Sequence, residues 1–515
     1  MQSRGIYEIS GDSRERRGSP FIFKKNKPIH APIKHIAIAI DMWYTILNDI
    51  IGGKSNMRTR DLTQSNRGIV EGVIWKQLLI YFFPILLGTF FQQLYNTVDA
   101  VVVGNFLGKE ALAAVGGATG TIINLLVGFF VGLSSGATVV ISQYFGSGDD
   151  EGVSRAVHTA IALSLAGGVI LMIVGIGGAR WALEMMGTTA DVIDGAADYM
   201  RIYFAGVIMN LLYNMSSGIL RAIGDSRRPM IYLIICCMVN IVLDLLFVGV
   251  IHMGVAGAAI ATIISQAVSA ILTMGALMRT TECYRFEIKK LKTFDAMLLG
   301  RILRIGFPAG IQSMMYSISN LLIQANINAL GTDTMAAWTA FGKVDCIIWM
   351  VMGAFSVAVT TFVGQNWGAG KIDRVKTSMR TGFILEFFST LFMSMVILVC
   401  GKYLIRLFTD DEGVIAIALT IMHCNVPLYA SFVPIDLFSG GMRGMGNSLG
   451  PMLIICFGVC VFRVLWLFTA VPLNNNVITI VVSYPISWVL TAIIMSIYFF
   501  RWCGRVGLRT PKAKA

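Results

Sequence analysis

The feature that most constrains this chain is a series of long stretches without charged residues. Between Lys76 and Asp99, for example, no residue carries a charge. About 20 apolar residues are enough for a helix to cross the hydrocarbon core of a bilayer. The composition agrees, because 56% of the 515 residues are hydrophobic and only 14% are charged, which is too apolar for an ordinary soluble protein. The chain is therefore predicted to be an all-α membrane protein.

The same criterion predicts twelve transmembrane helices. They lie near residues 75–103, 111–143, 153–178, 194–221, 229–250, 254–278, 299–329, 334–365, 376–400, 414–441, 449–471 and 476–500.

Loop charges predict how these spans are oriented. The connections near 221–228, 279–304 and 371–380 are basic and follow even-numbered spans, whereas the odd-numbered loops near 191–194 and 410–412 are acidic. Basic loops stay in the cytoplasm. We expect a multi-pass protein of the inner (cytoplasmic) membrane with both termini cytoplasmic. The net charge of +12 is then an orientation signal, and no nucleic-acid partner is expected.

The sequence repeats itself at an offset of 222 residues. The segment GILRAIGDSRRPM (218–230) recurs as GGMRGMGNSLGPM (440–452), and QYFGSG (143–148) recurs as QNWGAG (365–370). Each copy contains six spans, an even number, so the second copy enters the membrane in the same sense as the first. This arrangement predicts two six-helix lobes related by pseudo-twofold symmetry about an axis along the membrane normal.

The repeat divides the chain into five parts. These are a poorly structured N-terminal extension (1–56), an N-terminal six-helix lobe (57–279), a cytoplasmic interlobe linker (280–298), a C-terminal six-helix lobe (299–503) and a basic C-terminal tail (504–515).

Ionisable residues inside spans are costly, so each is a candidate for function. Asp99 lies in the first span and Asp244 well inside the fifth. Gln92 and Asn96 share a helix face with Asp99, and Asn240 is one turn before Asp244. Two carboxylates flanked by amide oxygens can bind Na⁺, or they can retain one proton that exchanges near neutral pH. These residues do not decide between the two cations.

Several of these motifs resemble those of the multidrug and toxic compound extrusion (MATE) family. The resemblance covers roughly residues 57 to 505. It rests on PILLG (84–88), QQLYNTVD (92–99), AAVG (113–116), GQNWGAG (364–370) and the paired Arg-x-x-Gly-Asp/Asn turns.

This resemblance implies a monomeric exporter of small organic, mostly cationic compounds, driven by entry of Na⁺ or H⁺. It implies no enzyme activity and no cofactor besides the coupling ion. In the branch with an N-terminal cation site, the matching positions, where Na⁺ would bind, are Asp99, Asn240, Asp244 and Thr262. The polar lining of the substrate chamber is matched by Gln92, Asn96, Asn210 and Asn214, each of which could equally form an interhelical hydrogen bond.

The C-terminal half offers further ionisable residues within its spans. They are Glu386, Asp436 and Arg463, with Asp345 near a helix start. Asp436 is a secondary candidate acid, but we favour a buried ion pair between Asp436 and Arg463. The seventh helix has no acidic residue over 309–330, which departs from family branches that need a glutamate there.

Three further expectations concern single residues. Arg221 and Arg443, at equivalent helix ends, are expected to cap helix carbonyls. Pro84 permits a bend in the first span, and we hypothesise that ion binding at Asp99 changes this bend. The alternative role for Asp244 is a helix cap or a pair with a loop lysine.

Other function classes fit the sequence less well. A flippase for lipid-linked saccharides or cell-wall precursors has a related architecture, but it tends to need a basic cavity, and Arg and Lys are nearly absent from the spans. A membrane enzyme would need a nucleophile and base motif or clustered histidines, which the sequence lacks. A passive channel is less consistent with a doubled lobe that has a polar site in one half.

Overall fold

The computed structural model describes residues 68–292 and 294–507. All of the described residues belong to one compact unit, which lies within residues 63–515. The predicted extension (1–56) and the end of the predicted tail (508–515) lie outside the described residues. Within the described ranges all regular structure is helical, as expected for an all-α membrane protein.

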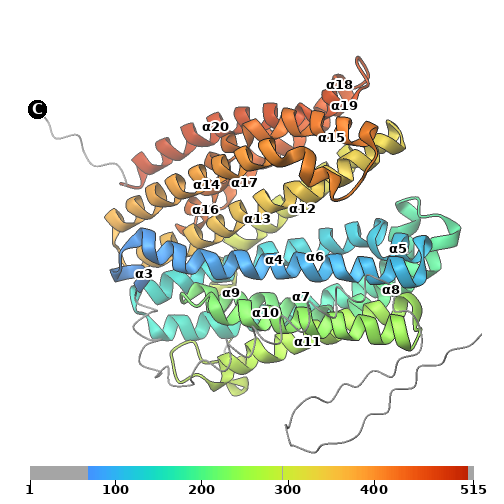
Figure 1. The fold of residues 1–515 in the computed structure, drawn as a ribbon. Coiled ribbons are helices and arrows are strands. Elements are labelled where there is room, and N and C mark those ends of the chain that lie inside the picture. Colours follow the sequence, from blue (N-terminus) through green and yellow to red (C-terminus); the bar gives the residue numbers. More distant parts are fainter. Residues whose placement is uncertain (1–67, 293, 508–515) are drawn as a thin grey trace, which may run out of the picture. The chain divides into compact units, whose positions relative to one another are not determined.

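The N-terminal lobe begins with one short helix and then contains six spans (Figure 1). Two of the spans are broken, at Gly117 and at Gly206, and the second break bends the chain by 49°. The elements are α3 (Gly68–Glu71), α4 (Ile74–Leu107), α5 (Lys109–Gly116) with α6 (Ala118–Ser147), α7 (Asp150–Met185), α8 (Ala190–Ala205) with α9 (Val207–Ala222), α10 (Arg227–Asp244) with the π-helix η1 (Leu245–Val250), and α11 (Gly254–Arg279).

The C-terminal lobe follows the 3₁₀-helix η2 (Ile288–Lys292) and also has six spans. Its first helix starts where the Asp295 carboxylate accepts hydrogen bonds from the backbone N–H groups of Met297 and Leu298, an N-cap. The elements are α12 (Ala296–Ala329), α13 (Thr332–Gly368), α14 (Ile372–Arg406), α15 (Glu412–Asn425) with η3 (Val426–Ser431) and α16 (Val433–Gly444), α17 (Leu449–Ile455) with the π-helix η4 (Cys456–Val461) and α18 (Phe462–Thr469), and α19 (Val477–Val481) with α20 (Ser483–Arg505).

The twelve predicted spans all correspond to helices, but one of them is less apolar than the rest. Ten described helices are long and apolar enough to cross a membrane, and the bent pair α8–α9 adds an eleventh. The remaining span is α12, which has 34 residues and so exceeds the required length. Its amides Gln312, Asn320 and Gln324 line a cavity of the C-terminal lobe, which explains its lower hydropathy.

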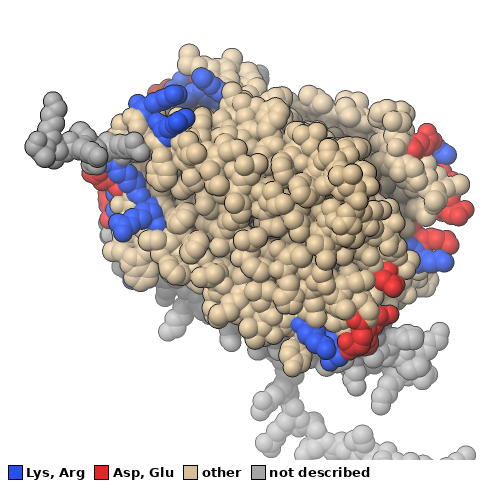
Figure 2. All heavy atoms as spheres, turned by 90° about the horizontal axis from the view of Figure 1, so that it is seen from above, with Lys and Arg blue, Asp and Glu red and all other residues tan. Residues whose placement is uncertain are grey.

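Charged side chains gather at the two ends of the helices. On the face shown in Figure 2, lysine and arginine are at one end, mostly acidic residues are at the other, and a broad band between them carries no charge. Large apolar side chains such as Phe388, Phe392 and Phe457 are more than half exposed. Such a band suits the hydrocarbon core of a bilayer and not water.

The two lobes meet along α6 and α12 through glycine. A Cβ built on Gly132 would lie 2.5 Å from the backbone N of Gly310, and one on Gly136 would lie 2.5 Å from the N of Gly306. Small residues allow transmembrane helices to approach this closely. The two predicted lobes are therefore joined by backbone-to-backbone packing.

Two equivalent glutamines connect the lobes a second time, where the QYFG and QNWG segments of the repeat cross. Gln143 Nε2 donates to the Gly444 carbonyl at 2.8 Å, and Gln365 Nε2 donates to the Ala222 carbonyl at 2.7 Å. Both the donors and the acceptors differ by 222 residues (365 − 143 and 444 − 222). The contact therefore obeys the pseudo-twofold symmetry that the repeat predicts.

These glutamines take the role that we expected of Arg221 and Arg443, and that expectation was wrong. Neither arginine side chain donates to a helix carbonyl within the described residues. The carbonyl of Arg221 itself accepts a hydrogen bond from the Tyr81 hydroxyl at 2.8 Å. The last carbonyls of α9 and α16 are buried between the lobes. A glutamine of the opposite lobe therefore donates to each of them, in place of the nearby arginine.

Candidate functional site

The two predicted acids of the N-terminal lobe lie next to each other. Asp99 on α4 and Asp244 at the end of α10 are 8% and 0% exposed, and their carboxyl groups are close enough for their charges to interact. Helices α4 and α10 pack along their lengths, which brings together residues that are far apart in sequence. The α-helical part of α10 ends at Asp244 and a π-helical turn begins, an irregularity that is frequent at functional sites.

No positive charge balances this pair. Among the described residues, no basic side chain lies within 4.0 Å of either carboxylate. The alternative role for Asp244, as a helix cap or a partner of a loop lysine, is therefore wrong. Asp99 Oδ1, both Asp244 oxygens and both polar atoms of the Asn240 amide are buried without a hydrogen-bond partner. Buried polar atoms are nearly always paired, so this cluster is incomplete without a ligand or a proton.

The chemistry of the cluster fits a hard cation. Carboxylate and amide oxygens bind such ions, whereas transition metals favour imidazole and thiolate. Thr262, the fourth predicted ligand, is 4% exposed on α11, which packs against α10. Its hydroxyl donates to the Ala258 carbonyl at 3.0 Å, so its oxygen can still accept or coordinate.

Sequence reasoning missed the aromatic wall beside the acids. Tyr199 and Tyr203 on α8 are buried and stack with ring centroids 6.4 Å apart. Tyr199 lies within electrostatic range of both carboxylates, and α8 packs against α11. The spacing of one helical turn between the two tyrosines, at the start of the fourth span, was the available signal.

The four amides predicted to line a substrate chamber do not form one group. Gln92 and Asn96 are exposed on α4, although they share its face with the buried Asp99. A long helix meets different neighbours along its length, so a shared face is not a shared environment. Asn214 Nδ2 donates to the backbone carbonyl and the side-chain oxygen of Asn210 at 2.9 and 3.0 Å, so this bond is intrahelical and not interhelical. Gln92 and Asn214 do line one small pocket together with Pro84.

The predicted ion pair between Asp436 and Arg463 is absent. No carboxylate lies within 4.0 Å of Arg463 in the described ranges, and Asp436 instead accepts a hydrogen bond from the Ser356 hydroxyl at 3.0 Å. The reason is that Arg463 on α18 stacks on aromatic rings of α20. Glu386 on α14 is fully buried and neither of its carboxyl oxygens has a partner.

Pro84 does not interrupt the first span, because α4 is one continuous helix from Ile74 to Leu107. The hypothesis that its bend responds to Asp99 remains a prediction.

Comparison with known proteins agrees with this architecture. The MatE family model matches the chain twice, over residues 84–246 and 308–469, one match in each lobe. The probable multidrug resistance protein YoeA of Bacillus subtilis is 27% identical over 83% of this chain and 94% of its own length. The probable multidrug resistance protein NorM of Thermotoga maritima is 28% identical over 76% of this chain and 84% of its own.

Solved structures are similar in fold. A MOP superfamily transporter from Pyrococcus furiosus aligns with a TM-score of 0.80 at 22% identity, covering 86% of this chain and 98% of that chain. A MATE protein in complex with MaL6 aligns with a TM-score of 0.79 at 22% identity, covering 86% and 99%. Because two copies of the family model cover well over half of the sequence, one per lobe, this chain belongs to the MATE family of membrane transporters and is not an enzyme.

Proposed function

We propose that this protein exports small organic compounds, mainly cations, across the cytoplasmic membrane in exchange for Na⁺ or H⁺, which binds at Asp99 and Asp244. The observation that carries the proposal is that these two carboxyl groups are buried, lie close enough for their charges to interact, and have no basic partner among the described residues. Asn240 supplies a further oxygen, and Thr262 is the fourth ligand in the sodium form of the site.

The physical argument is one of charge balance. Two carboxylates close together in a low-dielectric interior repel each other strongly, so the pair is stable only with a shared proton or a bound cation. Because the site must hold a positive charge, release and uptake of the cation can be coupled to a change in the arrangement of the two lobes. This requires that the two lobe arrangements bind the cation with different affinities.

The names of the relatives support the export of organic compounds. YoeA and NorM are described as probable multidrug resistance proteins, and MepA of Staphylococcus haemolyticus, 22% identical over 78% of this chain, as a multidrug export protein. The flippase alternative is less well supported. A phosphate headgroup needs a basic cavity, whereas Arg463 is the only arginine or lysine among the buried residues of the described part.

The test is transport by the purified full-length protein in proteoliposomes. Uptake or efflux of ethidium is followed by fluorescence with a sodium gradient alone and with a pH gradient alone. We expect one gradient to drive transport, and we expect Asp99→Asn and Asp244→Asn each to reduce the driven rate by at least about tenfold, which corresponds to the usual size of such coupling energies.

A matched control separates coupling from folding. Asp198 lies on α8 of the same lobe, with its side chain 66% exposed and paired with Arg201, so Asp198→Asn should transport like the unmodified protein. Full gradient-driven transport by both site variants would eliminate the assigned cation site. Ethidium flux that needs no counter-ion would indicate a channel instead.

A further inference from the structure

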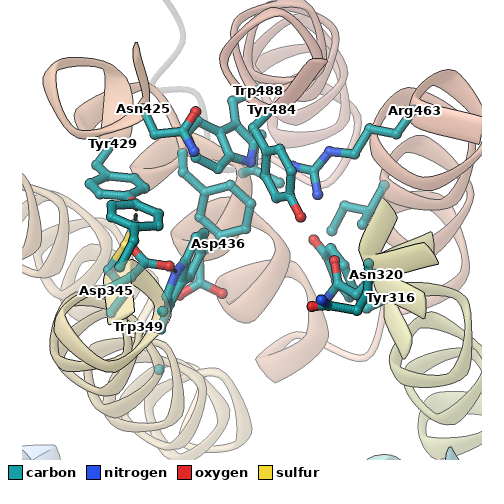
Figure 3. Close-up of a pocket in the computed structure, with 18 of the residues that line it drawn as sticks. Tyr316, Asn320, Asp345, Trp349, Asn425, Tyr429, Asp436, Arg463, Tyr484 and Trp488 are labelled. Atoms are coloured by element: carbon teal, nitrogen blue, oxygen red, sulfur yellow. Dashed lines mark hydrogen bonds between the residues drawn. The ribbon is translucent and has the colours of Figure 1, made fainter. Parts of the chain in front are cut away.

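A second candidate site lies in the C-terminal lobe, away from Asp99 and Asp244. It is a cavity of about 490 Å³ between α12, α13, α16, α18 and α20 (Figure 3). Cavities of 300–1,000 Å³ are typical of sites for small organic ligands. The residues that distinguish this cavity are an arginine and two aspartates separated by aromatic rings.

Arg463 provides a buried positive charge without a counter-charge. It is 3% exposed, and its guanidinium lies 3.9 Å from the ring centre of Tyr484 and 5.6 Å from that of Trp488. Its Nε donates to Ser487 Oγ at 3.0 Å, which is its only hydrogen bond within the described ranges. The rings and Ser487 hold the guanidinium in place, and its two terminal nitrogens remain free for a planar anion such as a carboxylate.

Two carboxylates provide negative charge elsewhere on the cavity wall. Asp345 on α13 accepts hydrogen bonds from the Tyr429 hydroxyl and from Trp349 Nε1, the latter at 2.8 Å. Asp436 on α16 accepts one from Ser356, and its Oδ2 is buried without a partner. In Figure 3, Asp345 and Trp349 lie on one side of the cavity and Arg463 lies on the other.

Aromatic rings fill the wall between the opposite charges. The Trp349 ring centre lies 4.9 Å from that of Phe432 and 5.9 Å from that of Trp488, both at steep angles. Tyr429 lies 5.2 Å from Trp488. Interlocked rings of this kind form a rigid apolar surface for a flat ligand, so the wall keeps the acids and the arginine apart.

We propose that this cavity binds aromatic zwitterions that carry a carboxylate at one end and an ammonium group at the other. The carboxylate pairs with Arg463, the ammonium pairs with Asp345 and Asp436, and the aromatic body lies on Trp349 and Trp488. Binding would give Arg463 a counter-charge and the free Oδ2 of Asp436 a donor, and charges without a counter-charge in a membrane interior are costly.

Ligands with a single charge fit less well. A simple cation leaves Arg463 unpaired and is repelled by it, and a simple anion meets two carboxylates. A metal ion would leave Arg463 unpaired in the same way, and no group of three or more His, Cys, Asp or Glu that could hold one exists among the described residues. The inference concerns binding in the other lobe and does not depend on the proposed exchange at Asp99 and Asp244.

The test compares three probes on the unmodified, full-length protein in lipid nanodiscs by isothermal titration calorimetry. The probes are 4′-(aminomethyl)biphenyl-4-carboxylate, its methyl ester, which keeps only the ammonium, and its N-acetyl derivative, which keeps only the carboxylate. We expect the zwitterion to bind at least about tenfold more tightly than either derivative, since each lost pair involves a charged hydrogen bond. Equal affinity for all three, or tightest binding of a singly charged probe, would overturn the proposal.

Two variants then assign the ends of the ligand. Arg463→Lys should lower affinity for the zwitterion and the N-acetyl probe, because lysine keeps the positive charge but cannot form a bidentate hydrogen bond with a carboxylate. The affinity for the methyl ester should not change. Asp345→Asn should lower affinity for the zwitterion and the methyl ester only. Equal losses for all three probes would mean a structural role and would contradict the site.

Asp198→Asn serves as the control in the other lobe, because Asp198 is exposed and paired with Arg201, and it should bind all three probes normally. This result separates the present inference from the coupling proposal, because calorimetry needs no gradient. Loss of zwitterion binding in Asp198→Asn would show that binding is not specific to this cavity and would contradict the proposal.

Discussion

Replacing Gln365 with alanine removes one of the two side chains that join the lobes at the repeated segments. Its amide donates to the carbonyl of Ala222, and both residues are fully buried. A buried carbonyl left without a donor costs about 1–3 kcal/mol. Since this contact exists only while the lobes touch there, the ratio of touching to separated lobes should fall by about 5- to 150-fold.

Hydrogen–deuterium exchange measures this change without labels, which suits a chain with nine cysteines. Separation of the lobes would also break the equivalent bond from Gln143 to Gly444. We therefore expect Gln365→Ala to speed exchange in two peptides, 218–226 and 440–448, because both would open together. Gln143→Ala should have the same effect on both peptides.

The control is Asn105→Ala, which removes an exposed amide of α4 that bonds within its own helix and should change neither peptide. Unchanged exchange in Gln365→Ala would refute the idea that this hydrogen bond stabilises the closed arrangement. Acceleration confined to 218–226 would refute the joint opening, because the reciprocal bond would then be independent.

Two further predictions follow from close contacts. Gly368→Ala would place a Cβ 1.9 Å from the Gln143 carbonyl oxygen, so we expect the free energy of unfolding to fall by about 1–3 kcal/mol, with a lower melting temperature. The control is Gly342→Ala, on the same helix with open space around it, which should melt at the normal temperature. Equal melting temperatures of the two variants would contradict the packing argument. His158 Nε2 accepts the backbone N–H of Glu287 in the linker at 3.1 Å, and His158→Phe leaves that N–H unpaired. Limited proteolysis of the linker should then speed up by about 5- to 30-fold, for a loss of about 1–2 kcal/mol, and an unchanged cleavage rate would mean that this bond does not hold the linker.

Several properties of the site could be predicted from local patterns. Asp99 and Asp244 stand out because charged residues are rare in apolar spans, and the structure places both in the interior of one lobe, close enough for their charges to interact. Tyr199 and Tyr203 were missed because buried tyrosine is common in helices and gives no comparable signal. The Asp436–Arg463 pair was predicted from opposite charge alone, but the aromatic rings of Tyr484 and Trp488 hold the arginine elsewhere.

The span pattern and the 222-residue repeat determine the helical class and the two-lobed plan, because a chain in a bilayer must satisfy its backbone hydrogen bonds within each helix. That requirement is local, and it can be recognised in a single sequence. Contacts between residues far apart in the sequence were decided only by the tertiary structure, among them the carboxyl pair in one lobe, the crossed glutamines, and the unpaired Arg463. Each of these contacts depends on how the helices pack. The neighbouring helix decides which polar partner a side chain meets, and the residue pattern within one helix does not specify that neighbour.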